Sequence, residues 1–199
     1  MGFKILSEKL NKLNDIKKEA MKCCSCPLGK TRTNLVFSDG NVDAKILLIG
    51  EAPGADEDAS GIPFVGRAGK LLNQFLNQAG IDRDKDIYIA NILKCRPPQN
   101  RTPVPSEKDA CFHFLKAQID VVQPKVIILC GSCAMSMFLP QKLPISKVRG
   151  QWFDYNENIK MMPIFHPSYL LRNHSLDEGK PRMLTLHDLE SIYTFASKK

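Results

Sequence analysis

The sequence predicts an α/β domain in three layers, with a largely parallel sheet between two layers of helices. Three apolar runs, at residues 45–50, 87–93 and 125–130, are short and end at or beside glycine or polar residues. Such runs are typical of strands that are buried on both faces. Segments with helical apolar spacing lie between them, and strands that alternate with helices along a chain form parallel sheets.

Length and composition are those of one soluble domain. The 199 residues are 43% hydrophobic and 25% charged, and no change in composition divides them, so we expect a single domain over residues 1–199. No apolar run approaches the roughly 20 residues that span a bilayer, and the N-terminus lacks the apolar segment of a secretory signal. We therefore expect a cytoplasmic protein without membrane contact. The net charge of +7 is compatible with a polyanionic partner.

The first quarter of the chain predicts a helix and a strand. Apolar residues recur at helical spacing among charged ones over residues 3–21, which predicts an amphipathic helix with a solvated outer face. This helix leads directly into a group of cysteines at residues 23–26. After a polar loop, residues 45–50 form the first strand. Residues 51–66 are rich in glycine, proline and acids, and we expect them to be too irregular for a helix.

The middle of the chain continues the alternation. Residues 67–79 have apolar side chains at helical spacing and are followed by Gly80, which predicts a helix and its end. Residues 87–93 form the second strand and lead into a basic, proline-rich loop at residues 94–103. The next helix begins near Ser106.

The last third predicts two further strands and a closing helix. Residues 125–130 form the third strand, and Gly131 opens a short helix that ends near Phe138. Residues 161–165 form the fourth strand, and apolar spacing over residues 185–196 predicts the closing helix.

Three of the expected strands end at polar residues that can carry chemistry. Glu51 follows the first strand, Asn91 lies at the end of the second, and His166 follows the fourth. Because open α/β sheets bind their ligands at the carboxyl ends of the strands, these three side chains are expected to converge on one site.

Four cysteines have the spacing of a metal site. Cys23 and Cys26 form a C-x2-C pair after the first helix, and Cys95 and Cys111 join the proline-rich loop to the helix after it. Four thiolates suit zinc or an iron–sulfur cluster, and spacing does not separate the two. A group of unrelated buried thiols is the alternative. The other cysteines are expected to be one bystander and two core residues: Cys24, Cys130 and Cys133.

Several short motifs follow one another along the chain: Gly50-Glu51-Ala52-Pro53-Gly54, Pro63-Phe64-Val65-Gly66, Lys94-Cys95-Arg96-Pro97-Pro98 with Asn100-Arg101, and His166-Pro167-Ser168. In this order, and with the C-x2-C-Pro-Leu opening, the chain resembles family 4 uracil-DNA glycosylases from about Cys23 to its end. The resemblance implies an α/β/α sandwich around a four-stranded parallel sheet. It also implies a structural [4Fe–4S] cluster whose ligands are Cys23, Cys26, Cys95 and Cys111.

The same resemblance implies an enzyme of base excision repair that extrudes uracil from DNA and hydrolyses its N-glycosidic bond, leaving an abasic site. Phe64 is expected to stack on the flipped base, and Asn91 to bind one edge of the pyrimidine with a donor and an acceptor. His166 is expected to donate a hydrogen bond to the uracil oxygen as negative charge develops there. Leu170 is expected to enter the DNA stack as a wedge, with a place in the core as the alternative.

Glu51 is the candidate for the second catalytic residue. Ala52 stands where the best-known uracil-DNA glycosylases carry an aspartate, so Glu51 is expected to orient water or to stabilise the cationic sugar. Gly50 and Ala52 are expected to contact the substrate. Glu57 and Asn100 are expected to assist at the site, with turn or capping roles as the alternative.

The expected partner is uracil-containing DNA, with Lys94, Arg96 and Arg101 as phosphate contacts and solvated charge as the alternative. We expect a monomer, and a sliding clamp or other repair proteins are its candidate protein partners. A non-catalytic iron–sulfur DNA-binding module, associated with a polymerase or repair complex, would not need the three polar residues at the strand ends. A zinc-dependent hydrolase would need an open coordination position, which a four-cysteine site lacks.

Overall fold

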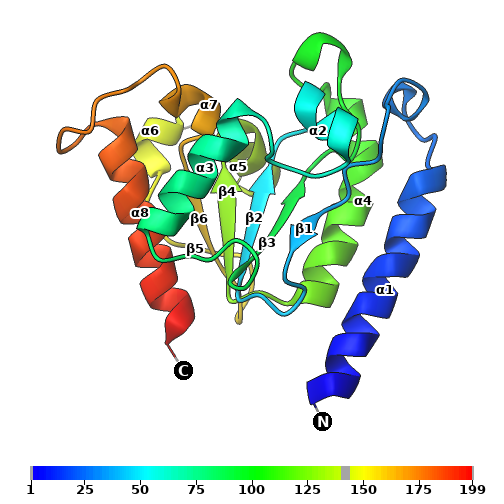
Figure 1. Ribbon diagram of the computed structural model, residues 1–199, viewed down its shortest axis with the longest axis horizontal. Helices are drawn as coiled ribbons and strands as arrows, with labels where there is room; N and C mark the ends of the chain where they lie inside the picture. The colour runs from blue at the N-terminus through cyan, green and yellow to red at the C-terminus, as the bar shows by residue number, and fades with distance from the viewer. Residues whose placement is uncertain (1, 140–143, 199) are drawn as a thin grey trace.

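In the computed structural model, which describes residues 2–139 and 144–198, six strands form one sheet with the order β1-β3-β2-β4-β6-β5 (Figure 1). The inner four are parallel and are β2 (Ile46–Gly50), β3 (Ile87–Asn91), β4 (Val126–Cys130) and β6 (Lys160–Ile164). The largely parallel sheet is confirmed. The expected count of four is exceeded by two antiparallel edge strands, β1 (Asp39–Gly40) and β5 (Phe153–Asp154), which are too short to produce an apolar run.

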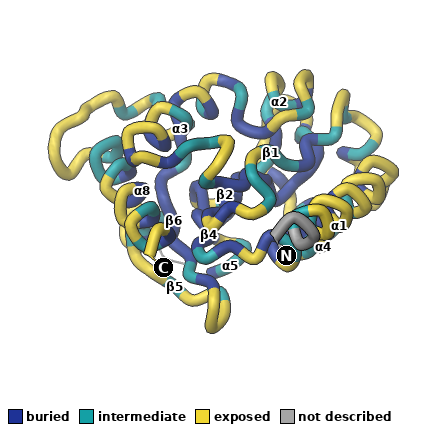
Figure 2. Tube along the Cα trace, turned by 60° about the horizontal axis from the view of Figure 1, so that its bottom comes forward, coloured by how far each residue is buried: buried dark blue, intermediate teal, exposed yellow. Residues whose placement is uncertain are grey.

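The helices are α1 (Gly2–Lys22), α2 (Ala55–Ser60), α3 (Arg67–Gln78), α4 (Pro105–Val122), α5 (Ser132–Phe138), α6 (Ile145–Val148), α7 (Pro167–Leu170) and α8 (Pro181–Ser197), with the 3-10 helices η1 (Pro27–Lys30) and η2 (Pro98–Asn100). They cover both faces of the sheet because successive residues of a strand point to opposite sides. Leu47 and Ile49 of β2 pack in the apolar cluster that includes α1, α4 and α5. Ile46 and Leu48 pack on the other side with α3, α7 and α8. Figure 2 shows the buried strands between helices whose outer sides are exposed.

The segment after β2 contains a helix that the sequence did not predict. Residues 55–60 form α2 although the segment is rich in glycine and acids. Its first turn holds Asp56, Glu57 and Asp58, and negative side chains stabilise the amino end of a helix. Gly61 ends the helix in the left-handed region at φ +74°, a conformation that favours glycine. The irregular composition therefore reflects both ends of a two-turn helix.

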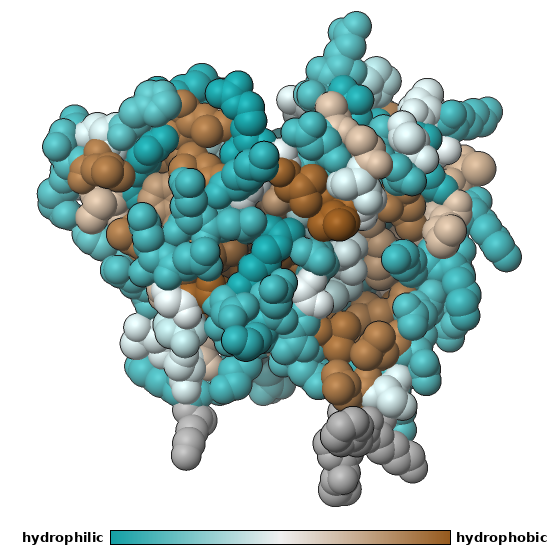
Figure 3. Space-filling view, in the orientation of Figure 1, coloured by the Kyte–Doolittle hydropathy of each residue, from teal (hydrophilic) through white to brown (hydrophobic). Residues whose placement is uncertain are grey.

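Polar side chains cover most of the face seen in Figure 3, and the apolar ones form separate patches. Among the described residues, none of the helices combines the length and apolar character that crossing a bilayer requires.

Candidate active site and cysteine cavity

A cavity of about 500 Å³ lies at the carboxyl ends of the parallel strands. Seven of the residues predicted for the site line it: Glu51, Ala52, Glu57, Phe64, Asn91, Asn100 and His166. Gly50 lies in the wall behind them, where a Cβ atom would come within 2.3 Å of Asn91 Oδ1 and 2.6 Å of the Phe64 ring. Only a glycine at this position therefore lets Asn91 and Phe64 keep their places.

Asn91 places an unpaired acceptor in this cavity. Its side chain is 2% exposed, and its Oδ1 atom has no hydrogen-bond partner among the described residues. A buried polar atom without a partner is costly, so such atoms mark sites where a ligand can supply the missing bond. The missing partner here is a donor, such as an N–H group.

The imidazole of His166 is oriented by Ser168. The backbone N–H of Ser168 donates to His166 Nδ1 at 3.1 Å, and Ser168 Oγ lies 2.7 Å from the same atom. Because Nδ1 accepts a hydrogen bond, the neutral ring carries its proton on Nε2 and can donate from there. Burial, aided by the positive charge of Arg172, lowers the pKa of His166 to about 4 although Glu57 opposes the shift. The ring is therefore a neutral donor near pH 7.

Glu51 lies half-buried in the cavity beside Cys133. Burial raises the pKa of the Glu51 carboxyl, while a hydrogen bond with the Cys133 thiol and the charge of Lys108 act in the opposite direction. Burial and the carboxylate raise the pKa of Cys133 to about 11, so the thiol stays protonated and able to donate. Cys133, predicted as a core residue, packs against the core but is only partly buried, and it also lines the cavity. Cys130, by contrast, is fully buried as expected.

Glu57 connects two of the sequence motifs. Its carboxylate accepts hydrogen bonds from the backbone N–H groups of Val65 at 2.9 Å, Gly66 at 2.8 Å and Gly54 at 3.0 Å. These bonds engage both carboxylate oxygens, so Glu57 fixes the loop that carries Phe64. Asn100 lines the cavity, and its Oδ1 accepts from Arg96 Nε at 2.7 Å.

Two predicted DNA contacts lie in the interior instead. Leu170 is 0% exposed and belongs to the apolar cluster of α3 and α8, so it does not fit the role of a DNA wedge. Its neighbour Tyr169 is 38% exposed and packs on Phe165 with ring centroids 5.1 Å apart. Lys94 is 1% exposed, and its Nζ donates to Asn91 O at 2.8 Å, so it cannot reach a phosphate. Tertiary packing, which the local sequence does not reveal, buries both side chains.

Arg101 and Arg96 are the remaining predicted phosphate contacts, and each lies in or next to the cavity lining. Arg101 lines it and pairs with Glu107 at 2.6 Å. Arg96 is partly exposed and bonds Asn100. Both guanidinium groups can meet a phosphate backbone.

A second, small cavity is lined by the four cysteines predicted as ligands: Cys23, Cys26, Cys95 and Cys111. Arg32 Nη1 donates to Cys95 Sγ at 3.2 Å, and the backbone N–H of Lys94 donates to Cys111 Sγ at 3.4 Å. Donors directed at sulfur stabilise a negatively charged thiolate. Over the described residues, no three His, Cys, Asp or Glu side chains are close enough together for one metal ion. Cys24 is exposed, as expected of a bystander.

Comparison with known proteins agrees with this arrangement. The family model of the uracil DNA glycosylase superfamily matches residues 37–190. A type-4 uracil-DNA glycosylase of Thermotoga maritima is 48% identical, over 92% of this chain and 94% of its own length. A second, from Archaeoglobus fulgidus, is 42% identical over 85% of this chain and 88% of its length. The chain belongs to the type-4 family of this superfamily.

This chain also resembles part of a much larger protein. A DNA polymerase of Bacillus phage SP01 is 35% identical over 80% of this chain, which corresponds to 17% of the polymerase. The two type-4 relatives, in contrast, match this chain over nearly their whole length. The chain therefore corresponds to nearly the whole of two proteins named type-4 uracil-DNA glycosylases, but to only a small part of the polymerase.

Proposed function

We propose that this chain is a uracil-DNA glycosylase that extrudes uracil from DNA and hydrolyses its N-glycosidic bond, leaving an abasic site. The observation that carries the proposal is the buried Oδ1 of Asn91, which finds no partner within residues 2–139 and 144–198 and lies in a cavity that also holds the Nε2–H donor of His166. Asn91 Oδ1 can accept from the N3–H group of uracil, and His166 Nε2–H can donate to a uracil oxygen. Membership of the type-4 family supports the same activity.

Asn91 accounts for selectivity over cytosine. Its Oδ1 accepts the N3–H of uracil, and its amide N–H donates to O4. Cytosine reverses this pattern, because N3 is an acceptor and the 4-amino group is a donor. The structure places the amide oxygen, rather than the amide nitrogen, at the buried position beside Gly50. Cytosine would therefore leave buried polar groups unpaired, which discriminates more strongly than shape.

The remaining residues act on the glycosidic bond. As the bond from the sugar to uracil N1 breaks, its electron pair moves onto the base, and His166 Nε2–H stabilises the charge on the uracil oxygen. Positive charge develops on the sugar, and the Glu51 carboxylate stabilises it, orients the water that attacks C1′ and accepts the proton that this water loses. Phe64 provides the apolar surface against which the extruded ring stacks. Gly50 and Ala52 form the adjacent wall, and we propose that the chain acts as a monomer.

The four-cysteine cavity is proposed to hold a [4Fe–4S] cluster with a structural role. The ligands come from the segment after α1, from the loop before η2 and from α4, so a cluster would tie these parts together. The loop that it would hold carries Pro97, Asn100 and Arg101, all of which line the active-site cavity. A cluster there supplies rigidity to the DNA-facing loop, and the bond-breaking chemistry belongs to the other cavity.

A panel of DNA oligonucleotides tests the function. Each carries one uracil, thymine or cytosine at the same position, and alkali then cuts any abasic site. We expect cleavage at uracil alone, undiminished by EDTA. A DNA-binding module without catalysis would bind the strands and leave all three intact, and a zinc-dependent hydrolase would lose its activity in EDTA.

A further inference from the structure

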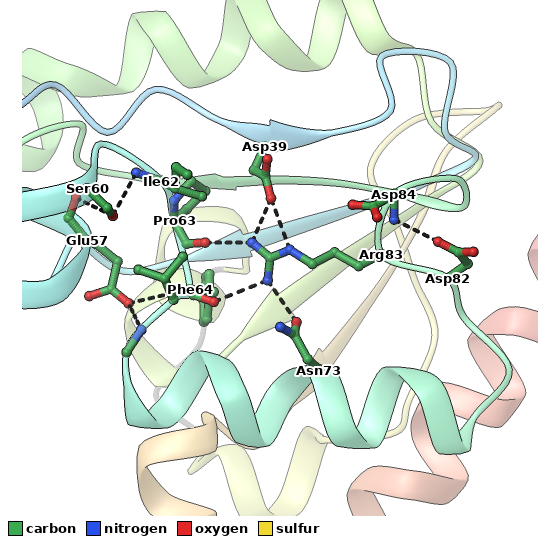
Figure 4. Close-up of polar contacts among 12 residues, drawn as sticks. Asp39, Glu57, Ser60, Ile62, Pro63, Phe64, Asn73, Asp82, Arg83 and Asp84 are labelled. Carbon is green, nitrogen blue, oxygen red and sulfur yellow. Dashed lines mark hydrogen bonds and ion pairs between the residues drawn. The ribbon is translucent and has the colours of Figure 1, made fainter.

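Arg83 lies behind the active-site cavity and uses every N–H of its guanidinium group (Figure 4). Nε and Nη2 donate to Asp39 Oδ2 at 3.0 and 2.8 Å. Nη1 donates to Asn73 Oδ1 at 2.8 Å and to Phe64 O at 3.2 Å, and Nη2 donates to Pro63 O at 2.7 Å. The Arg83 side chain is 15% exposed. The group thus joins β1, α3 and the Phe64 loop from a turn between α3 and β3.

The two carbonyl groups that Arg83 binds lie on either side of the Phe64 Cα atom. Holding both carbonyls fixes both peptide planes, and with them the φ and ψ angles of Phe64. Phe64 has φ +54°, in the left-handed region that residues with a Cβ atom avoid. On the far side, Glu57 accepts from the N–H of Val65, so the peptide that follows Phe64 is held at both its oxygen and its nitrogen.

The close packing around Phe64 leaves its ring little space to take another position. A Cβ atom at Gly69 would come within 2.0 Å of Phe64 O, and one at Gly50 within 2.6 Å of the ring. The backbone of α3 and the end of β2 therefore approach Phe64 as closely as glycine allows. The ring centroid lies 6.1 Å from that of His166, on the same cavity. Small backbone shifts at residue 64 would move the ring relative to His166.

We propose that Arg83 is the positioning residue of the base pocket: it holds Phe64 in a disfavoured backbone conformation so that the ring presents its face to the extruded base. The stacking role of Phe64 rests on the proposed function. Lysine cannot substitute, because a single ammonium group lacks the planar fork that reaches two carbonyls, a carboxylate and an amide at once. The control is Arg149, which is 16% exposed, pairs with buried Asp188 and lies outside the cavity lining.

Fluorine NMR tests the positioning directly. The full chain is labelled with 4-fluorophenylalanine, and the signal of residue 64 is the one missing from Phe64→Leu. We expect Arg83→Lys to shift or broaden this signal, and Arg149→Lys to leave it unchanged although both variants lower the Tm. An unchanged residue-64 signal in folded Arg83→Lys would overturn the proposal.

Kinetics then tests whether the effect passes through Phe64. Arg83→Lys is expected to slow single-turnover uracil release by about 10- to 100-fold, as misplacement of a contacting group does. In a Phe64→Ala background the same substitution should change the rate by less than about twofold, because residues that act through one another are not additive. Equal factors in both backgrounds would contradict the proposal. If the wild-type chain releases no uracil, the proposed function fails, while the fluorine signal still decides the role of Arg83.

Discussion

The backbone N–H of Ser168 donates to Nδ1 of His166, and this contact decides which nitrogen of the imidazole carries the proton. A backbone N–H can only donate, so Nδ1 must accept and Nε2 must hold the hydrogen. Burial lowers the pKa of the ring to about 4, which keeps it neutral in this form. The cavity therefore contains a fixed donor that needs no proton from solvent.

Replacement of His166 should act on bond breaking. His166→Ala is expected to slow single-turnover uracil release by about 10²- to 10³-fold, the typical loss for a preorganised donor. Ser168→Ala removes a hydroxyl but keeps the backbone N–H, so its loss should be much smaller. Rapid-quench measurement of the two variants checks this order. Equal losses would show that the hydroxyl, rather than the backbone, orients the ring.

The pH dependence of uracil release should report Glu51. Its pKa is raised by burial, so lowering the pH protonates it and removes the charge that we propose orients water. His166 stays neutral until the pH nears 4, so it does not contribute above that point. We expect single-turnover rates to fall as the pH drops through the raised pKa of Glu51. The residual activity of Glu51→Gln should not fall in this way at low pH. If the rate of the variant still fell with the wild-type pH profile, another group would be responsible.

The same carboxyl should lower the stability of the folded protein. Its pKa is higher in the folded state than in the unfolded chain, so the folded state binds the proton more tightly and loses stability as the pH rises through the folded-state value. Glu51→Gln is therefore expected to raise the Tm at pH 7, with the gain vanishing below about pH 4. Calorimetry at both pH values measures this.

Glu107 provides a control, because its pKa is shifted in the opposite direction from that of Glu51. The Arg101 guanidinium lowers its pKa, so its ionised form stabilises the folded state above the unfolded-state pKa, and this stabilisation is lost as the pH falls through the folded-state value. Glu107→Gln should lower the Tm at pH 7. A drop in Tm for Glu51→Gln at pH 7 would contradict our expectation that burial of the ionised Glu51 carboxylate lowers the stability of the folded protein.

If the proposed cluster is present, replacing a ligand cysteine and replacing a cysteine outside the ligand set should give different results. Cys111→Ser should lower iron content, visible absorbance and Tm together, because Cys111 is buried and lines the cysteine cavity. Cys24→Ser should leave all three unchanged, because Cys24 is exposed and lies outside that lining. Iron analysis and absorption spectra of both variants decide the matter. A wild-type protein that contains zinc and no iron would contradict the cluster.

Much of the sheet and part of the site could be predicted from the sequence. Each parallel strand is a short apolar run with breakers beside it, and parallel strands place their carboxyl ends at one edge. The convergence of Glu51, Asn91 and His166 follows from that rule, although their chemical roles stay predictions. The two edge strands could not be found because two residues carry no periodicity.

Other features depend on contacts that no local pattern encodes. Arg83 is one charged residue in a polar turn, and its partners Pro63 and Phe64 lie about twenty positions away. Leu170 follows the His166-Pro167-Ser168 motif but packs into the core through α7. Cys133 lies three residues after a buried strand, and only the start of α5 directs it to Glu51. Position after a strand end is the one signal that could have identified Cys133.

Release of free uracil tests the central claim most directly. Uracil-containing DNA is incubated with wild-type protein and with Asn91→Ala from a parallel preparation, and the free base is measured by mass spectrometry. We predict one uracil released per site by the wild type, and release about 10- to 100-fold slower by Asn91→Ala, which corresponds to about 1–3 kcal/mol of lost hydrogen bonding. Absence of free uracil, or equal rates for the two proteins, would contradict the account.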